Sequence, residues 1–115
     1  MVKRKSSYEV QIAENLRGGD GSVKMDHLLN KEELNNKGRL YAKLTLEPGC
    51  SVGFHIHENE MESYTILSGE AEYDDNGEAV KLYPGDTTHT APGEGHAIKN
   101  SGNIPLEFNA LILFA

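Results

Sequence analysis

The chain alternates short runs of apolar and polar residues with turn residues, a pattern typical of β-strands joined by tight turns. Residues 39–46 show it most clearly, because large apolar side chains alternate with polar ones until Pro48-Gly49 ends the run. Asn76-Gly77 supplies the positive φ angles of a tight hairpin turn. Further strands are predicted at residues 8–12, 51–57, 62–67, 70–73, 79–83, 87–91, 96–100 and 106–114. We therefore expect an all-β sandwich or jelly-roll barrel.

The N-terminal segment follows the pattern less clearly. Residues 22–29 fit either a strand or an extended arm, and Asn30, three positions before Glu33, predicts a helical turn over residues 31–35. A small jelly roll leaves sheet edges exposed, and pairing them in a two-fold dimer is a common remedy. Because the segment before Leu40 can reach a partner's sheet, we expect a homodimer with an exchanged N-terminal strand. Its apolar anchors would be Leu28, Leu29 and Leu34.

Composition narrows the class of protein. The 115 residues suffice for one domain with a modest core. The net charge of −7 argues against nucleic-acid binding, which needs a basic surface, and against an anionic membrane surface. No apolar run has the length of a membrane span, and no apolar stretch follows the basic N-terminus, so no signal peptide is predicted. A single cysteine, Cys50, fits a cytoplasmic location.

Candidate chemistry lies in the stretch from Gly49 to Gly69. His55 and His57 are one residue apart, and side chains at i and i+2 of a strand share one face. Two imidazoles would therefore point toward one position, a spacing that suits a metal ion. Glu62 follows just before a predicted strand and could add a carboxylate.

Two sets of residues resemble the motifs of the cupin family. In the first, five residues separate Gly49 from His55-x-His57, four lie between His57 and Glu62, and six between Glu62 and Gly69. The second resembles the segment from Gly85 to Asn100. Its matching positions are Gly85, Gly93, His96 and Asn100, whereas Ala91 stands where the family has proline and Pro92 comes one position later. Fifteen residues separate the motifs, so the chain resembles a small, single-domain cupin.

The resemblance implies a double-stranded β-helix, or jelly-roll barrel. Residues 1–38 would form an N-terminal arm with the first strands, and residues 39–115 the conserved barrel. It also implies that a divalent transition metal is bound inside the barrel by His55, His57, Glu62 and His96. Three imidazoles and a carboxylate suit Mn, Fe, Co, Ni, Cu or Zn, and such a site usually leaves positions for water or substrate.

Strand parity and position suggest roles for other residues. If Glu62 points inward, Tyr64 and Ile66 do too, and Ile98 joins His96. Tyr64 is either a pocket phenol or core filling, and Glu62 and Tyr64 are the candidate catalytic residues. The other polar residues are given structural roles: His27 at the surface or an interface, Asn100 as a turn partner and Cys50 as a small buried residue. His89 is expected on a sheet face, the alternative being a place beside the metal site or against a substrate. Glu58 and Glu60 are expected as solvated loop charges, although Glu60 could approach a substrate at the mouth of the barrel.

Several functions remain open at this point. The first hypothesis is a metal-dependent enzyme acting on a small organic molecule, by dioxygenase-like or other oxidoreductase or lyase chemistry, with decarboxylation and isomerisation included. The alternatives are a metal-dependent binding or sensing module without turnover, and an isomerase-type cupin for sugars or keto acids. A structural or storage role is disfavoured by the full set of ligand-type residues.

Overall fold

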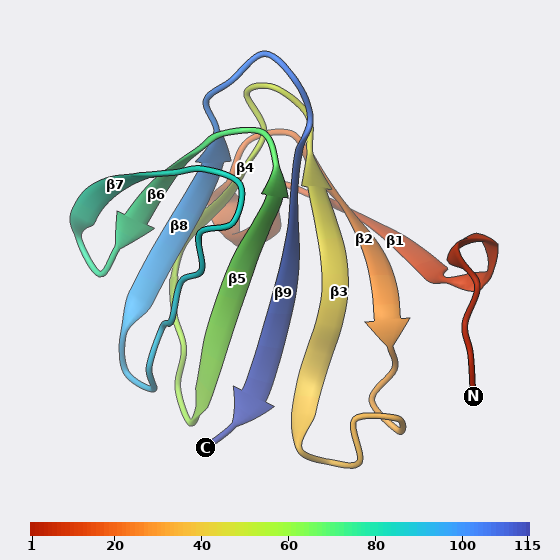
Figure 1. Cartoon of the computed structure of the whole chain (residues 1–115). Helices are drawn as coiled ribbons and strands as arrows, with labels where there is room; N and C mark the ends of the chain where they lie inside the picture. The colour runs from red at the N-terminus through yellow and green to blue at the C-terminus, as the bar shows by residue number, and fades with distance from the viewer.

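The computed structural model describes all 115 residues and contains two antiparallel β-sheets that face each other (Figure 1). The five-stranded sheet has the order β1-β2-β3-β9-β5 and the four-stranded sheet the order β4-β8-β6-β7. The strands are β1 Glu9–Glu14, β2 Ser22–Leu29, β3 Gly38–Leu46, β4 Ser51–Ile56, β5 Glu60–Ser68, β6 Ala71–Asp75, β7 Glu78–Leu82, β8 Gly95–Asn100 and β9 Leu106–Phe114. Two short 3-10 turns, η1 Lys5–Ser7 and η2 Leu16–Gly18, flank β1.

The core lies between the two sheets. Burial alternates along β3, β5 and β9, so each strand presents one apolar face to the opposite sheet. In β5 the buried positions are Glu62, Tyr64 and Ile66, and Ile98 is buried on β8 with His96, which confirms the parity prediction. The largest fully buried apolar side chains are Tyr64, Phe108, Leu46, Ile66, Ile98 and Leu106.

One predicted strand, residues 87–91, is wrong. The segment runs beside β5 but makes only isolated bridges, Glu62 with Thr90 and Thr65 with Thr87. The ladder is interrupted because the Tyr64 backbone N–H donates to the hydroxyl of Thr88, at 3.1 Å, in place of a backbone carbonyl. A threonine side chain thus competes with the regular ladder.

The segment between β2 and β3 forms the predicted cap and a single helical turn, in which the Leu34 backbone N–H donates to the Asn30 carbonyl at 3.0 Å. The Asn30 backbone N–H donates to Glu33 at 2.9 Å, and the Glu33 N–H donates to the Asn30 side chain at 2.8 Å, as in a capping box. Residues 31–36 continue as hydrogen-bonded turns only. Asn35 and Asn36 have positive φ angles of 55° and 59°, which end the helical turn before a second one forms.

The N-terminal segment belongs to the larger sheet. Residues 22–29 form a strand, and β1 pairs with β2 of the same chain from Glu9 opposite His27 to Glu14 opposite Ser22. Val10 and Ile12 of β1 remain 52% and 57% exposed. The homodimer with an exchanged N-terminal strand stays a prediction, and these two side chains are its natural contact points. The structure contains no helix whose length and hydropathy would let it cross a membrane.

Candidate metal centre

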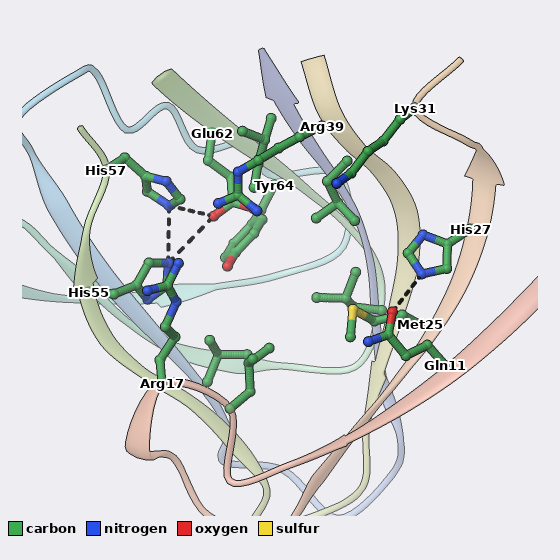
Figure 2. Close-up of a pocket in the computed structure, with 15 residues that line it drawn as sticks. Gln11, Arg17, Met25, His27, Lys31, Arg39, His55, His57, Glu62 and Tyr64 are labelled. Atoms are coloured by element: carbon green, nitrogen blue, oxygen red, sulfur yellow. Dashed lines mark hydrogen bonds and ion pairs between the residues drawn. The ribbon is translucent and has the colours of Figure 1, made fainter. Parts of the chain in front are cut away.

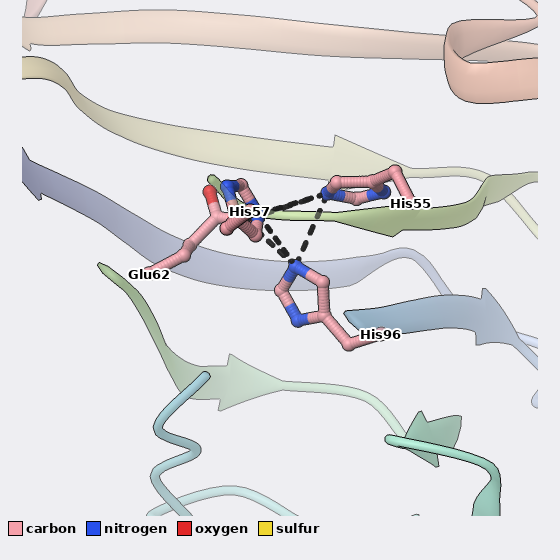
Figure 3. Close-up of side chains that lie close together, drawn as sticks. All are labelled: His55, His57, Glu62 and His96. Carbon is pink, nitrogen blue, oxygen red and sulfur yellow. Dashed lines mark hydrogen bonds and ion pairs between the residues drawn. The ribbon is translucent and has the colours of Figure 1, made fainter. Parts of the chain in front are cut away.

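Four side chains from three strands and one loop converge between the two sheets (Figure 3). The Nε2 atoms of His55, His57 and His96 lie 3.0 to 3.2 Å from one another. The Glu62 Oε1 atom lies 2.8 Å from the Nε2 atoms of both His57 and His96, and 3.7 Å from that of His55. His57, Glu62 and His96 are buried, with 1%, 3% and 0% exposure. The four residues that the sequence selected are therefore brought together.

The pairing register between β4 and β8 brings the histidines of the cluster together. His55 stands directly opposite His96, whereas Val52 stands opposite Ile98, so β4 has one residue more than β8 over this span. The extra residue is a β-bulge beside Gly53, and it lets both Val52 and His55 point inward. His57 follows just past the end of β4, where its backbone N–H donates to the Glu94 carbonyl at 3.0 Å.

Each imidazole is oriented by a partner on its other nitrogen. His55 Nδ1 lies 2.8 Å from the Gly53 carbonyl oxygen, and His57 Nδ1 lies 2.8 Å from Glu60 Oε1. Both partners are acceptors, so both rings carry their proton on Nδ1 and aim the Nε2 lone pair at the cluster. His96 Nδ1 is 2.6 Å from the Tyr73 hydroxyl. Such contacts are the ones that orient metal-bound histidines.

The protonation of the cluster follows from these contacts. Burial would raise the pKa of Glu62, but the surrounding imidazoles of His55, His57 and His96 outweigh it and hold that pKa well below its usual range. The hydrogen bond to Glu62 raises the pKa of His57 above 6.5, whereas burial lowers the pKa of His96. Glu62 is thus an anion in the folded protein, and the three imidazoles compete for its charge.

The donor set fits a transition metal. Lone pairs that face one another at 3.0 to 3.2 Å repel unless a proton or a cation lies between them. For a metal–nitrogen distance of about 2.0–2.1 Å, adjacent ligand atoms are separated by about 2.9 Å in octahedral and about 3.4 Å in tetrahedral geometry. The spacings between the three nitrogens fall between these limits, and the Glu62 oxygen lies just outside them, at 2.8 and 3.7 Å from those nitrogens. The cluster could therefore hold a divalent ion such as Zn, Mn, Fe, Co, Ni or Cu.

A pocket of about 270 Å³ opens beside the cluster (Figure 2). His55, His57, Glu62 and Tyr64 form one wall, and Met25, His27 and Gln11 lie across the cavity from them. Arg17, Lys31 and Arg39 add cationic groups. Glu62 is the only carboxylate in the lining. Although the chain is acidic overall, this pocket therefore favours an anion.

Comparison with known proteins places this site in a family. The Cupin domain family matches residues 42–114. The chain is a cupin. A Thermotoga maritima protein named "Oxalate-binding protein" is 50% identical over 113 residues, which cover 98% of this chain and 93% of the relative. The crystal structure of a predicted oxalate decarboxylase from the same organism is 49% identical, covers 100% of both chains and has a TM-score of 0.96.

A third similar structure belongs to a different kind of protein. It is the cupin domain of an XRE family transcriptional regulator from Enterobacter cloacae, with 26% identity and a TM-score of 0.70, covering 81% of this chain and 97% of that one. The comparisons confirm the predicted double-stranded β-helix of a small cupin.

Tyr64 of this cupin is both core and pocket. Its ring stacks on His96 with centroids 4.8 Å apart and contacts Phe108 at 4.7 Å, so the ring fills the core. Its hydroxyl is directed into the pocket (Figure 2). Burial raises the pKa of Tyr64 well above its usual range, with the Glu62 charge adding to the effect. The hydroxyl is thus protonated and available as a hydrogen-bond donor.

One interpretation from the sequence is corrected. Glu60 is not a solvated loop charge: it lies in β5, accepts two hydrogen bonds from Arg39 at 2.7 Å and bonds His57. The bond from Arg39 lowers the pKa of Glu60 to about 2. His27 is partly exposed, as expected, and in addition lines the pocket, 3.0 Å from Gln11. One sequence feature could have indicated the role of Glu60: it lies three residues after His57, a ligand-type histidine, at the start of a strand.

Two other interpretations are confirmed, and one is corrected. Glu58 is exposed. His89 is exposed and outside the cluster, but it lies in the segment beside β5 that forms no regular strand, so it is not on a sheet face. Asn100 is buried and holds turns: its side-chain amide donates to the carbonyls of Leu46 and Ile104 at 2.8 Å. Cys50, in contrast, is only partly buried and packs against the edge of the core.

Metal affinity of this cupin is expected to rise with pH through neutrality. A protonated imidazole cannot bind a cation, and Glu62 raises the pKa of His57 above 6.5 in the metal-free protein. Below that pKa, each pH unit should weaken the apparent affinity about tenfold, because one proton is released for each ion bound. Calorimetric titration with Co²⁺ at several pH values, in buffers of different ionisation enthalpy, measures both quantities. A pH-independent affinity would contradict the arrangement.

Proposed function

We propose that this cupin is a metal-dependent binding protein for small carboxylates of the oxalate type. The observation that carries the proposal is the charge of the pocket. Three cationic side chains line it, of which Arg39 is paired with Glu60 and Arg17 and Lys31 are not neutralised within the lining, and its single carboxylate, Glu62, is already surrounded by histidines. The name of the Thermotoga maritima relative supports the same ligand class.

Different residues of the site would bind the metal ion and the carboxylate ligand. His55, His57, Glu62 and His96 would hold the ion, which when bound supplies positive charge and open positions for ligand oxygens. Arg17 and Arg39 would bind the carboxylate oxygens that face away from the ion, since guanidinium groups match carboxylates in shape and charge. The Tyr64 hydroxyl, for which no protein partner is found, would donate a hydrogen bond to the ligand.

Decarboxylation is the second candidate, and the Tyr64 hydroxyl is the observation that favours it. Splitting oxalate into carbon dioxide and formate requires a proton at the carbon that loses its neighbour. The protonated Tyr64 hydroxyl faces the pocket beside the cluster, and Glu62 and Tyr64 would then be the catalytic residues. We favour binding without turnover because burial makes Tyr64 a weak acid and Glu62 is held by three histidines. The dioxygenase-like chemistry stays a prediction.

Oxalate is expected to bind the Co²⁺-loaded protein with a stoichiometry of one, and Arg17→Gln should weaken it about tenfold. A hydrogen bond to a charged group contributes about 1.5–3 kcal/mol, of which an exposed arginine such as Arg17 gives the lower part. Isothermal titration calorimetry measures the affinity. The matched control is Arg4→Gln, another exposed arginine, which lies outside the pocket.

The same samples distinguish the two candidates. Formate and carbon dioxide are assayed after long incubation with oxalate. Saturable oxalate binding without product supports the binding role. Formate produced in molar excess over the protein would show that the protein is a decarboxylase instead. If the metal-loaded protein shows no heat and no product with oxalate, the proposed function is wrong.

A further inference from the structure

The pocket beside the cluster is larger than oxalate requires. Its volume is about 270 Å³, close to the lower end of the range of roughly 300–1,000 Å³ that accommodates drug-sized ligands. At about 30 Å³ for each water molecule in the liquid, the cavity corresponds to about nine waters. Oxalate has only two carbons and four oxygens. Most of the space would therefore be left for something else.

The surplus space is bordered by apolar side chains. Met25 of β2, Leu44 of β3, Val52 of β4 and Ile112 of β9 line the pocket, and each is less than a tenth exposed. Leu40 adds a further apolar contact on β3. None of these side chains offers a hydrogen bond, so water in this region would lack partners on most sides. Such a surface favours a hydrocarbon group.

Most of the polar groups lie at the two ends of the apolar region. Figure 2 shows the cluster with Arg17, Arg39 and Tyr64 on one side of the cavity and Met25 beside the His27–Gln11 pair on the other, while the Lys31 ammonium group reaches in between them at one edge. His27 Nε2 and Gln11 Oε1 lie 3.0 Å apart, so these two polar atoms already satisfy each other. A ligand that reaches across the pocket thus leaves a charged end and enters an apolar surrounding.

We infer that this site takes a carboxylate with an apolar tail, namely a 2-oxo acid with a short alkyl chain. The inference rests on the proposed function and names its ligand class. A 2-oxo acid has the same pair of oxygens on adjacent carbons as oxalate, so its head can occupy the cluster in the same way. Its chain then extends over Leu40, Leu44 and Met25, a region that the two carbons of oxalate are too short to fill.

The test is a chain-length series measured by calorimetry on the Co²⁺-loaded protein. The probes are oxalate, pyruvate, 2-oxobutanoate, 2-oxopentanoate and 2-oxohexanoate. Burying one methylene group contributes about 0.8 kcal/mol, which is about a fourfold change in Kd. From pyruvate to 2-oxohexanoate, three added methylenes should therefore tighten binding about 50-fold.

A pair of leucine variants locates the effect in the pocket. Leu40→Gln places an amide in the apolar region and should reduce the ratio of the pyruvate Kd to the 2-oxohexanoate Kd about tenfold. Leu111→Gln makes the same change on β9 at a partly buried position outside the pocket, and the ratio should not change. A ratio that falls equally in both variants would contradict the assignment.

The outcomes separate this inference from the function beneath it. If oxalate binds and the 2-oxo acids bind with affinities that do not depend on chain length, the apolar tail is wrong and the proposed function stands. If neither oxalate nor any 2-oxo acid binds, the proposed function itself fails. The wild-type series gives this result even if Leu40→Gln does not fold.

Discussion

Replacement of His57 by alanine is expected to lower the affinity for a divalent transition metal by at least about 100-fold. The His57 Nε2 atom lies close to all three other ligand atoms of the cluster, at 2.8 Å from Glu62, 3.0 Å from His55 and 3.1 Å from His96. Losing a residue that only orients a ligand costs about 10–100-fold in metal affinity, and losing a ligand costs at least the upper end of that range.

The measurement is metal content after dialysis, together with calorimetric titration by Co²⁺ and Zn²⁺. His89→Ala is the matched control, because it removes an exposed histidine outside the cluster and should leave both results unchanged. A thermal melt gives an independent signal. Metal at 100 times its Kd stabilises the native state by about 2.7 kcal/mol, so wild type should melt about 10 °C higher than its chelator-treated form. Stoichiometric metal in His57→Ala would overturn the site.

The sequence was most informative where chemistry depends on spacing along one strand. The i, i+2 relation of His55 and His57 places both rings on one face whatever the rest of the chain does. The second motif then supplied His96 from a distant strand, and the structure puts it opposite His55. The same parity correctly placed Tyr64 and Ile98. These predictions needed only the period of a strand and two motifs in register.

The sequence was least informative where the register is broken. By simple alternation Arg39 and Leu40 should face opposite sides of β3, yet both line the pocket. The register of β3 against β9 shifts between Gly38 and Leu40, and this β-bulge turns Arg39 toward the cavity. No sequence pattern around Arg39 predicts this β-bulge. The anion-binding character of the pocket therefore emerges only from the folded chain.

Glu60 shows a second limit. Its neighbours in the sequence are charged and polar, so a solvated loop was the natural interpretation. In the structure it joins Arg39 on β3 to His57 beside the cluster, with bonds of 2.7 and 2.8 Å. This role depends on two strands that are not adjacent in the sequence. A residue that acts by linking distant groups is visible only once those groups are in place.

The bulge at Gly53 connects the stability of the fold to the site. A Cβ atom at Gly53 would lie 2.1 Å from the Arg17 carbonyl oxygen, and one at Gly19 would lie 2.3 Å from the Ser51 carbonyl oxygen. The backbones of η2 and β4 therefore touch directly, with no room for a side chain. The Gly53 carbonyl also accepts the hydrogen bond that orients His55, at 2.8 Å. Arg17 lines the pocket from the other side of this contact.

Gly53→Ala is accordingly expected to destabilise the protein by about 3 kcal/mol, since backbone atoms cannot move aside as a flexible side chain can. The same displacement should weaken metal binding about tenfold through His55. Urea unfolding of the metal-free protein measures the first effect and Co²⁺ titration the second. Gly102→Ala is the matched control, because its Cβ would meet nothing closer than 3.6 Å, and its stability should stay within about 0.5 kcal/mol of wild type. Equal stability of the two variants would show that the backbones of η2 and β4 can move apart without a measurable cost. The pocket wall that carries Arg17 would then not be held in a fixed position.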